Sequence, residues 1–100
     1  MKVVISNRAL SRLESWLSFQ QEVLEIPLDV IKRLHRELID AAFSLSQFPN
    51  KGQIEPQIIS PNKTYRRIVV RHVKIIYRVA EDHILITDFF DTRQDPDLLR

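Results

Sequence analysis

The chain has 100 residues, of which 44% are hydrophobic and 28% are charged, with a formal net charge of +2 and no cysteine. These values predict one ordinary globular domain spanning residues 1–100, and the lack of cysteine excludes disulfides and thiolate metal sites. The sequence shows no charged-then-apolar leader and no apolar run near the ~18 residues of a membrane span. We therefore expect a cytoplasmic protein without a membrane partner.

The first half of the chain predicts one strand followed by two helices. Residues 2–6 form a β-branched run typical of a strand, and Ser6 or Asn7 can then cap a helix. That helix is expected to stop before Pro27, since the residue preceding proline avoids helical geometry. Pro27 itself is expected at the first position of the second helix. Two helices joined so closely predict an antiparallel hairpin.

Residues 65–78 predict two strands joined by a two-residue turn at Arg71-His72, with Val70 opposite Val73. Side chains alternate between the two faces of a strand, so one face is apolar and the other is cationic and partly apolar. The second face carries Tyr65, Arg67, Val69, Lys74, Ile76 and Arg78. Arg-His is a poor sequence for such a turn. A bulge or a longer loop is therefore the alternative, and it would move the cations of one strand to the other face.

Residues 83–90 predict a further strand, and apolar residues on both of its faces indicate a central strand covered on both sides. Residues 49–63 predict an extended loop in which residues 57–59 pack or pair briefly. The predicted fold is therefore α+β with the order β-α-α-β-β-β. An antiparallel helical hairpin packs on one face of a small, mostly antiparallel four-stranded sheet. Val69, Ile76, Leu85 and Phe89 are expected on the uncovered face, where apolar side chains among cations suggest a partner surface.

Charge is strongly segregated along the second half of the chain. Residues 61–80 contain six basic and no acidic side chains, whereas residues 81–97 contain six acidic side chains and only Arg93 as a base. One interpretation is a positive sheet surface that attracts phosphate. The other is that the acidic segment lies across the basic strands and neutralises them.

Few kinds of catalytic chemistry fit the sequence. His35, His72 and His83 are too far apart to predict a metal site, and the single glycine cannot build a phosphate loop. We expect no metal and no cofactor. The remaining candidates are the cations Arg67, Lys74, Arg78 and Arg93 together with Tyr65, because converging cations can stabilise a phosphoryl transition state. The alternative is that they are solvated cations on an amphipathic hairpin.

Four segments together resemble the RelE/ParE superfamily, the toxins of type II toxin–antitoxin modules, which are also called plasmid-stabilisation proteins. They are Tyr65–Val70, Lys74–Val79, Ile84–Ile86 and the ending Asp91-Thr92-Arg93-Gln94-Asp95-Pro96. The resemblance covers essentially the whole chain. It implies a cytoplasmic bacterial toxin that causes growth arrest and is held inactive by the C-terminal segment of a cognate antitoxin on its open face. Tyr65, Val69, Ile76, Arg78, Leu85 and Phe89 are the residues expected to bind the antitoxin or the target.

The superfamily divides into two activities. RelE-like members cleave mRNA on the translating ribosome. Here the resemblance matches Lys74, Arg93 and either Arg66 or Arg67 to their basic residues, which makes Arg67, Lys74 and Arg93 the candidate catalytic residues. ParE-like members inhibit DNA gyrase instead. The ending Leu98-Leu99-Arg100 has no tyrosine or histidine to serve as a general base, so the sequence favours the ParE-like activity. A RelE-like endonuclease, a member that only binds an antitoxin, and a non-toxic basic nucleic-acid-binding module are the alternatives.

Overall fold

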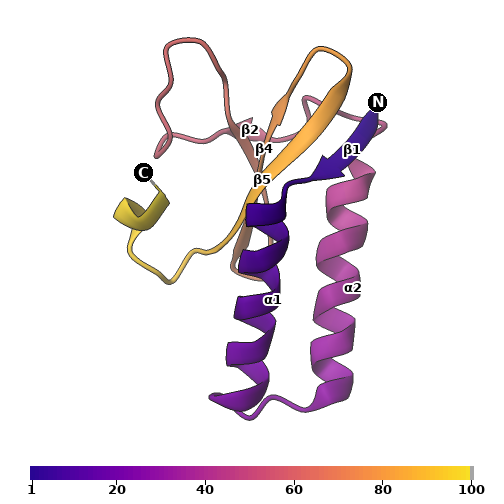
Figure 1. Ribbon diagram of the computed structural model, residues 1–100, viewed down its shortest axis with the longest axis vertical. Helices are drawn as coiled ribbons and strands as arrows, with labels where there is room; N and C mark the ends of the chain where they lie inside the picture. Colours follow the sequence, from indigo (N-terminus) through magenta and orange to yellow (C-terminus); the bar gives the residue numbers. More distant parts are fainter. Residues whose placement is uncertain (100) are drawn as a thin grey trace.

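The computed structural model describes residues 1–99 and confirms the α+β class, with two helices and a five-stranded mixed sheet (Figure 1). In chain order the elements are β1 (Lys2–Ile5), α1 (Asn7–Glu22), α2 (Leu28–Ser44), β2 (Gln53–Ile54), β3 (Arg66–Val70), β4 (Val73–Val79), β5 (His83–Asp91) and a short 3₁₀ helix, η1 (Pro96–Leu99). Of the predicted ending 98–100, residue 100 lies outside the described residues.

The sheet has the strand order β1-β5-β4-β3-β2, in which β1 runs parallel to β5 and every other pair is antiparallel. The prediction of four strands was one short, because β2 forms within the segment expected to be a loop. Its two residues pair with Arg66 and Arg67 of β3. A two-residue strand is too short to show an alternating pattern, so its sequence carries no signal.

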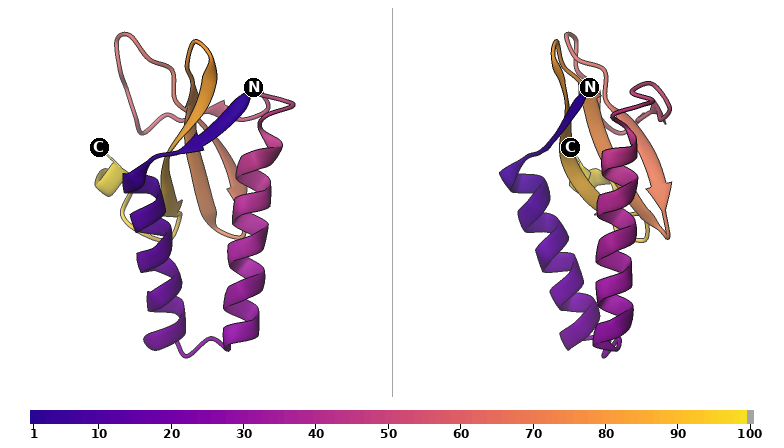
Figure 2. Two further views of the ribbon diagram at one scale, coloured as in Figure 1. Left: turned by 45° about the vertical axis from the view of Figure 1, so that its right-hand side comes forward. Right: turned by 90° about the vertical axis from the view of Figure 1, so that its right-hand side faces the viewer.

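The helices form an antiparallel hairpin on one face of the sheet, and its tip projects beyond the sheet (Figures 1 and 2). Ser6 caps α1 as expected, since its Oγ accepts a hydrogen bond from the amide of Ala9 at 3.1 Å. Pro27 is the N-cap of α2, one position earlier in the helix than predicted. No helix among the described residues is long and apolar enough to cross a membrane.

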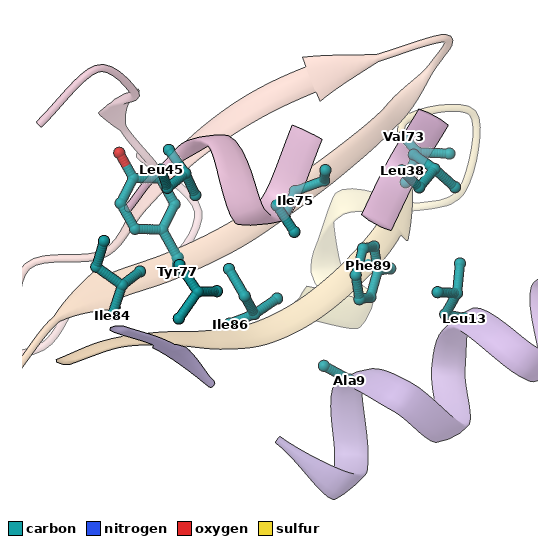
Figure 3. Packing of buried hydrophobic residues seen from close by; sticks show 12 residues of the cluster. Ala9, Leu13, Leu38, Leu45, Val73, Ile75, Tyr77, Ile84, Ile86 and Phe89 are labelled. Carbon is teal, nitrogen blue, oxygen red and sulfur yellow. The ribbon is translucent and has the colours of Figure 1, made fainter. Parts of the chain in front are cut away.

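The main core lies between the helices and the sheet (Figure 3). The helical hairpin packs on the apolar sheet face through Ala9 and Leu13 of α1, Leu38 and Ala42 of α2, and Leu45, the C-cap of α2. The sheet face carries Val73, Ile75, Tyr77, Ile84 and Ile86. These side chains are almost completely buried. The face of the β3–β4 hairpin that the sequence assigned to the core is therefore the face that the helices cover.

The β3–β4 hairpin has the predicted two-residue turn and register, with Val70 opposite Val73 and Ile68 opposite Ile75. Arg71 and His72 both adopt positive φ angles, 47° and 67°, which is the backbone geometry that such a turn requires. The poor turn sequence is accepted because any shift of register would move the apolar side chains of both strands away from the core.

An irregularity in the β4–β5 pairing changes the predicted orientation of the end of β5. Ile76 pairs with Asp88 but Tyr77 pairs with Ile86, so Thr87 is an extra residue in β5. A bulge of this kind reverses the alternation beyond it. Phe89 therefore points into the main core and not to the uncovered face, and Phe90 takes the opposite side. The expectation for Phe89 was wrong for this reason.

The centre of the second sheet face is covered by the chain itself. Ile76, Phe90 and Leu99 form a smaller buried cluster, against which Ile58 and Tyr65 pack. The expectation that Ile76 is an exposed partner residue was therefore wrong, because its side chain is fully buried. The contribution of Ile58 agrees with the prediction that residues 57–59 pack on the sheet.

Candidate functional site

Lys74 and Arg67 meet on the sheet face opposite the helices, and both contact the carboxylate of Glu55. Lys74 Nζ donates to both carboxylate oxygens at 2.7 and 3.1 Å, and Arg67 Nε lies 3.4 Å from Oε2. Arg67 Nη1 also donates to the carbonyl of Ile54 at 2.6 Å. Glu55 follows β2 directly and is only 1% exposed. The two cations are therefore held around one buried counter-charge.

Arg93 lies on the opposite side of the sheet and binds Asp91. Its Nε and Nη2 donate to the two oxygens of Asp91 at 2.9 and 2.7 Å, and its amide donates to Oδ1. Trp16 Nε1 of α1 donates to Oδ2 at 3.0 Å. The hydrogen bond from Arg93 is the main cause that holds the pKa of Asp91 well below its usual range. Arg93 is thereby fixed to the helix side, next to Trp16.

The third internal carboxylate, Asp88, is compensated from α1. Arg8 Nη2 and Arg12 Nε lie 3.7 and 3.6 Å from its oxygens, and Oδ1 has no hydrogen-bond partner within the described part of the chain. Burial raises the pKa of Asp88 above its ordinary value, although the two arginines oppose this effect. Asp88 and Asp91 therefore have different partners and form no catalytic pair.

These contacts bear on the two interpretations of the segregated charge. Asp88 contacts Arg8 and Arg12 of α1, and Asp91 contacts Arg93, so neither of these two buried carboxylates neutralises the basic hairpin. That role belongs to Glu55, which the sequence did not single out. It is an isolated carboxylate in an expected loop, and no spacing links it to Lys74, 19 residues later. No group of three or more metal-ligating side chains occurs within residues 1–99.

Comparison with known proteins identifies the family. A family model described as the ParE toxin of the type II toxin–antitoxin system, parDE, matches residues 3–96. The chain belongs to this family. The fold is also that of a solved chain titled "Chromosomal ParDE TA system from P. aeruginosa", with a TM-score of 0.75 and 16% identity over 93% of this chain and 97% of that one. Comparison with curated protein sequences gives no significant match. The resemblance to the RelE/ParE superfamily is thus confirmed, and the parDE family implies a cognate antitoxin.

The residues that the sequence predicted to bind the antitoxin or the target differ in their exposure. Val69 is exposed on the open face, and Tyr65, Arg78 and Leu85 are half-buried, whereas Ile76 and Phe89 are buried. Ile59 is a further exposed apolar side chain beside this face, since it lines a cavity together with Ile58 and Leu99 of the smaller buried cluster. A second exposed apolar group, which the sequence analysis did not single out, is the hairpin tip formed by Phe19, Val23, Leu24 and Leu28. Helical periodicity places apolar residues there, but only the projection of the hairpin shows that they have no sheet to cover.

A groove connects this hairpin tip with the segment that follows β5. It has a volume of about 390 Å³ and lies among Trp16, Phe19, Phe89, Asp91 and Gln94. Trp16 is thus both the hydrogen-bond partner of Asp91 and part of the groove wall. The groove therefore joins the helical hairpin to the C-terminal segment.

Proposed function

We propose that the chain inhibits DNA gyrase and is held inactive by its antitoxin, and that it does not cleave mRNA. The proposal rests on one observation: each of the three candidate catalytic cations forms an ion pair with a carboxylate of the chain. Lys74 and Arg67 bind Glu55, whereas Arg93 binds Asp91 on the other side of the sheet. Cations that stabilise a transferring phosphoryl group must converge on one point and carry uncompensated charge. These three cations meet neither condition.

The hairpin tip supports the gyrase assignment by its shape and chemistry. Phe19, Val23, Leu24 and Leu28 are each about half exposed or more, and they lie where both helices extend past the sheet (Figure 2). A contiguous exposed apolar group of this kind marks a protein contact. A projecting tip can enter a cleft of a large enzyme. We assign this surface to the target.

The open face supports the antitoxin assignment. Val69 is exposed there, and the exposed Ile59 lines a cavity of about 430 Å³ together with Pro56, Ile58 and Leu99. A segment that folds on binding can cover such an extended surface. We assign the antitoxin to this face, so that antitoxin and gyrase use different apolar surfaces.

The test uses two matched valine variants and a supercoiling assay. Purified chain added to gyrase and relaxed plasmid should block supercoiling. Val23→Asp at the hairpin tip should lose this inhibition, and Val69→Asp on the open face should retain it but lose antitoxin binding. Both valines are more than half exposed, so neither change disturbs the core. Inhibition that survives Val23→Asp would refute the assignment of the tip.

The endonuclease alternative is tested in parallel with a cell-free translation system. We expect primer extension on translated mRNA to show no new cuts after addition of the wild-type chain. Codon-spaced cuts that need ribosomes and disappear in Lys74→Ala would overturn the proposal and establish the RelE-like activity. Uncut mRNA together with blocked supercoiling is the result that supports gyrase as the target.

A further inference from the structure

One group of cations on the basic hairpin has no counter-charge. A polar cavity of about 280 Å³ lies where β3 begins and β4 ends. It is lined by Asn50, Asn62, Lys63, Thr64, Arg66, Arg78 and Val79, and no carboxylate is among them. We propose that this cavity binds a phosphate group. The proposal does not depend on the identity of the toxin's target.

The charge of the cavity distinguishes it from the other cations of the hairpin. Lys63 and Arg78 form no ion pair or side-chain hydrogen bond with any other residue in the range 1–99. Arg66 donates one N–H group to the carbonyl of Gly52 at 2.8 Å, and its guanidinium has further N–H donors. Three cationic residues therefore line one small cavity, a combination that concentrates anions.

The cavity is held in shape by a buried clamp. The fully buried Tyr77 accepts a hydrogen bond from the amide of Gly52 at 2.9 Å and donates its own hydroxyl proton to the carbonyl of Pro49 at 2.8 Å. A Cβ atom at Gly52 would lie 2.7 Å from both the carbonyl of Arg67 and the Tyr77 hydroxyl, so only glycine fits. The clamp fixes the segment that carries Asn50 and anchors Arg66. Asn50 and Arg66 are thus positioned before a ligand arrives.

The set of donors matches phosphate better than a carboxylate. A phosphate monoester carries a charge of about −1.5 to −2 and three strong acceptor oxygens. Two guanidinium groups and one ammonium group supply three positive charges, of which a phosphate monoester compensates more than a single carboxylate does. The amides of Asn50 and Asn62 and the hydroxyl of Thr64 add neutral donors. The volume also leaves room for part of a sugar, so the ligand class is a nucleotide or a polynucleotide backbone.

The experiment measures binding of two probes, inorganic pyrophosphate and a 12-base-pair DNA duplex, by isothermal titration at low salt. Wild-type chain should bind at least one probe. Arg78→Gln and Lys63→Gln should each weaken that binding at least tenfold. The matched controls Arg36→Gln and Lys32→Gln remove the same charges from the exposed face of α2 and should change affinity less than threefold. Thermal melts of all four variants establish that they are folded.

Each result has a defined meaning. Saturable binding of pyrophosphate that requires Arg78 and Lys63 supports a site for free phosphate compounds. Binding of the duplex alone, with a salt dependence that becomes shallower by about one unit in Arg78→Gln, supports a backbone-phosphate site. Equal losses in Arg78→Gln and Arg36→Gln would show only general attraction to a basic protein and would overturn the proposal. Lack of binding of both probes to the wild-type chain would overturn it as well.

Discussion

The carboxylate of Glu55 is predicted to be a main determinant of stability, and replacing it by glutamine tests this. Glu55→Gln keeps the shape of the side chain and one acceptor oxygen but removes the only charge that the structure places against Lys74 and Arg67. The side chains of these two cations are only 18% and 22% exposed. Water can therefore replace the lost carboxylate only in part.

The expected magnitude follows from the burial. Removing one partner of a buried ion pair costs about 3–5 kcal/mol, because the remaining charge is left uncompensated. The residual exposure of both cations and the retained oxygen of glutamine place the value near the lower end, at about 3 kcal/mol. For a domain of this size, such a loss lowers the melting temperature by roughly 12–24 °C.

Urea unfolding at pH 7, followed by circular dichroism, measures this free energy. Glu37→Gln is the matched control, because the pair of Glu37 with Arg71 is exposed and solvent-screened pairs of this kind contribute little to stability. In Glu55→Gln/Lys74→Met, a cation is removed together with the carboxylate, and the double variant should be less destabilised than the sum of the single changes. A loss in Glu55→Gln as small as that in Glu37→Gln would refute the reasoning.

Three further changes test the turn, the clamp and the helix-side ion pair. His72→Gly should raise the free energy of unfolding by about 0.5–1 kcal/mol in urea, because glycine adopts the φ of 67° without steric cost but is more flexible in the unfolded chain. Tyr77→Phe should lower it by about 2 kcal/mol, since the buried amide of Gly52 loses its acceptor. Asp91→Asn should lower the melting temperature at pH 7. Because the folded-state pKa of Asp91 is lowered, this difference should shrink as the pH falls below about 4, towards the depressed pKa.

The regular elements could be predicted from the sequence because each one has a periodic apolar pattern. The β3–β4 register follows from alternation around Val70 and Val73, and this pattern outweighs the unfavourable turn residues Arg71 and His72. The end of β5 could not be predicted in the same way. Because β5 has apolar residues on both faces, its sequence shows no apolar–polar alternation that a bulge would interrupt. The extra residue Thr87 therefore reverses the expected orientation of Phe89, and the sequence pattern gives no sign of it.

The candidate site could be predicted only at the level of residue types. The sequence placed Arg67 and Lys74 correctly on the sheet face opposite the helices, but whether their charge is compensated depends on partners that are distant in the sequence. Glu55 compensates Lys74, and Asp88, which the sequence groups with the acidic end, compensates Arg8 and Arg12. Net charge counted along segments cannot show such pairings, because strand pairing and loop packing determine them. The sequence therefore could not tell which cations remain free.

The hairpin tip and the phosphate cavity lie near opposite ends of the molecule. The hairpin tip around Val23 is at one end of the long axis, whereas the loop that follows α2 and carries Asn50 is at the other (Figure 1). The principal extent along this axis is 41 Å. Changes at sites so far apart, with no shared partners, act independently. Val23→Asp should therefore leave phosphate binding unchanged, and Arg78→Gln should leave the protein as stable as before. If Arg78→Gln also weakens gyrase inhibition, then the cavity contacts DNA held by the enzyme, because it is too distant to act through the tip.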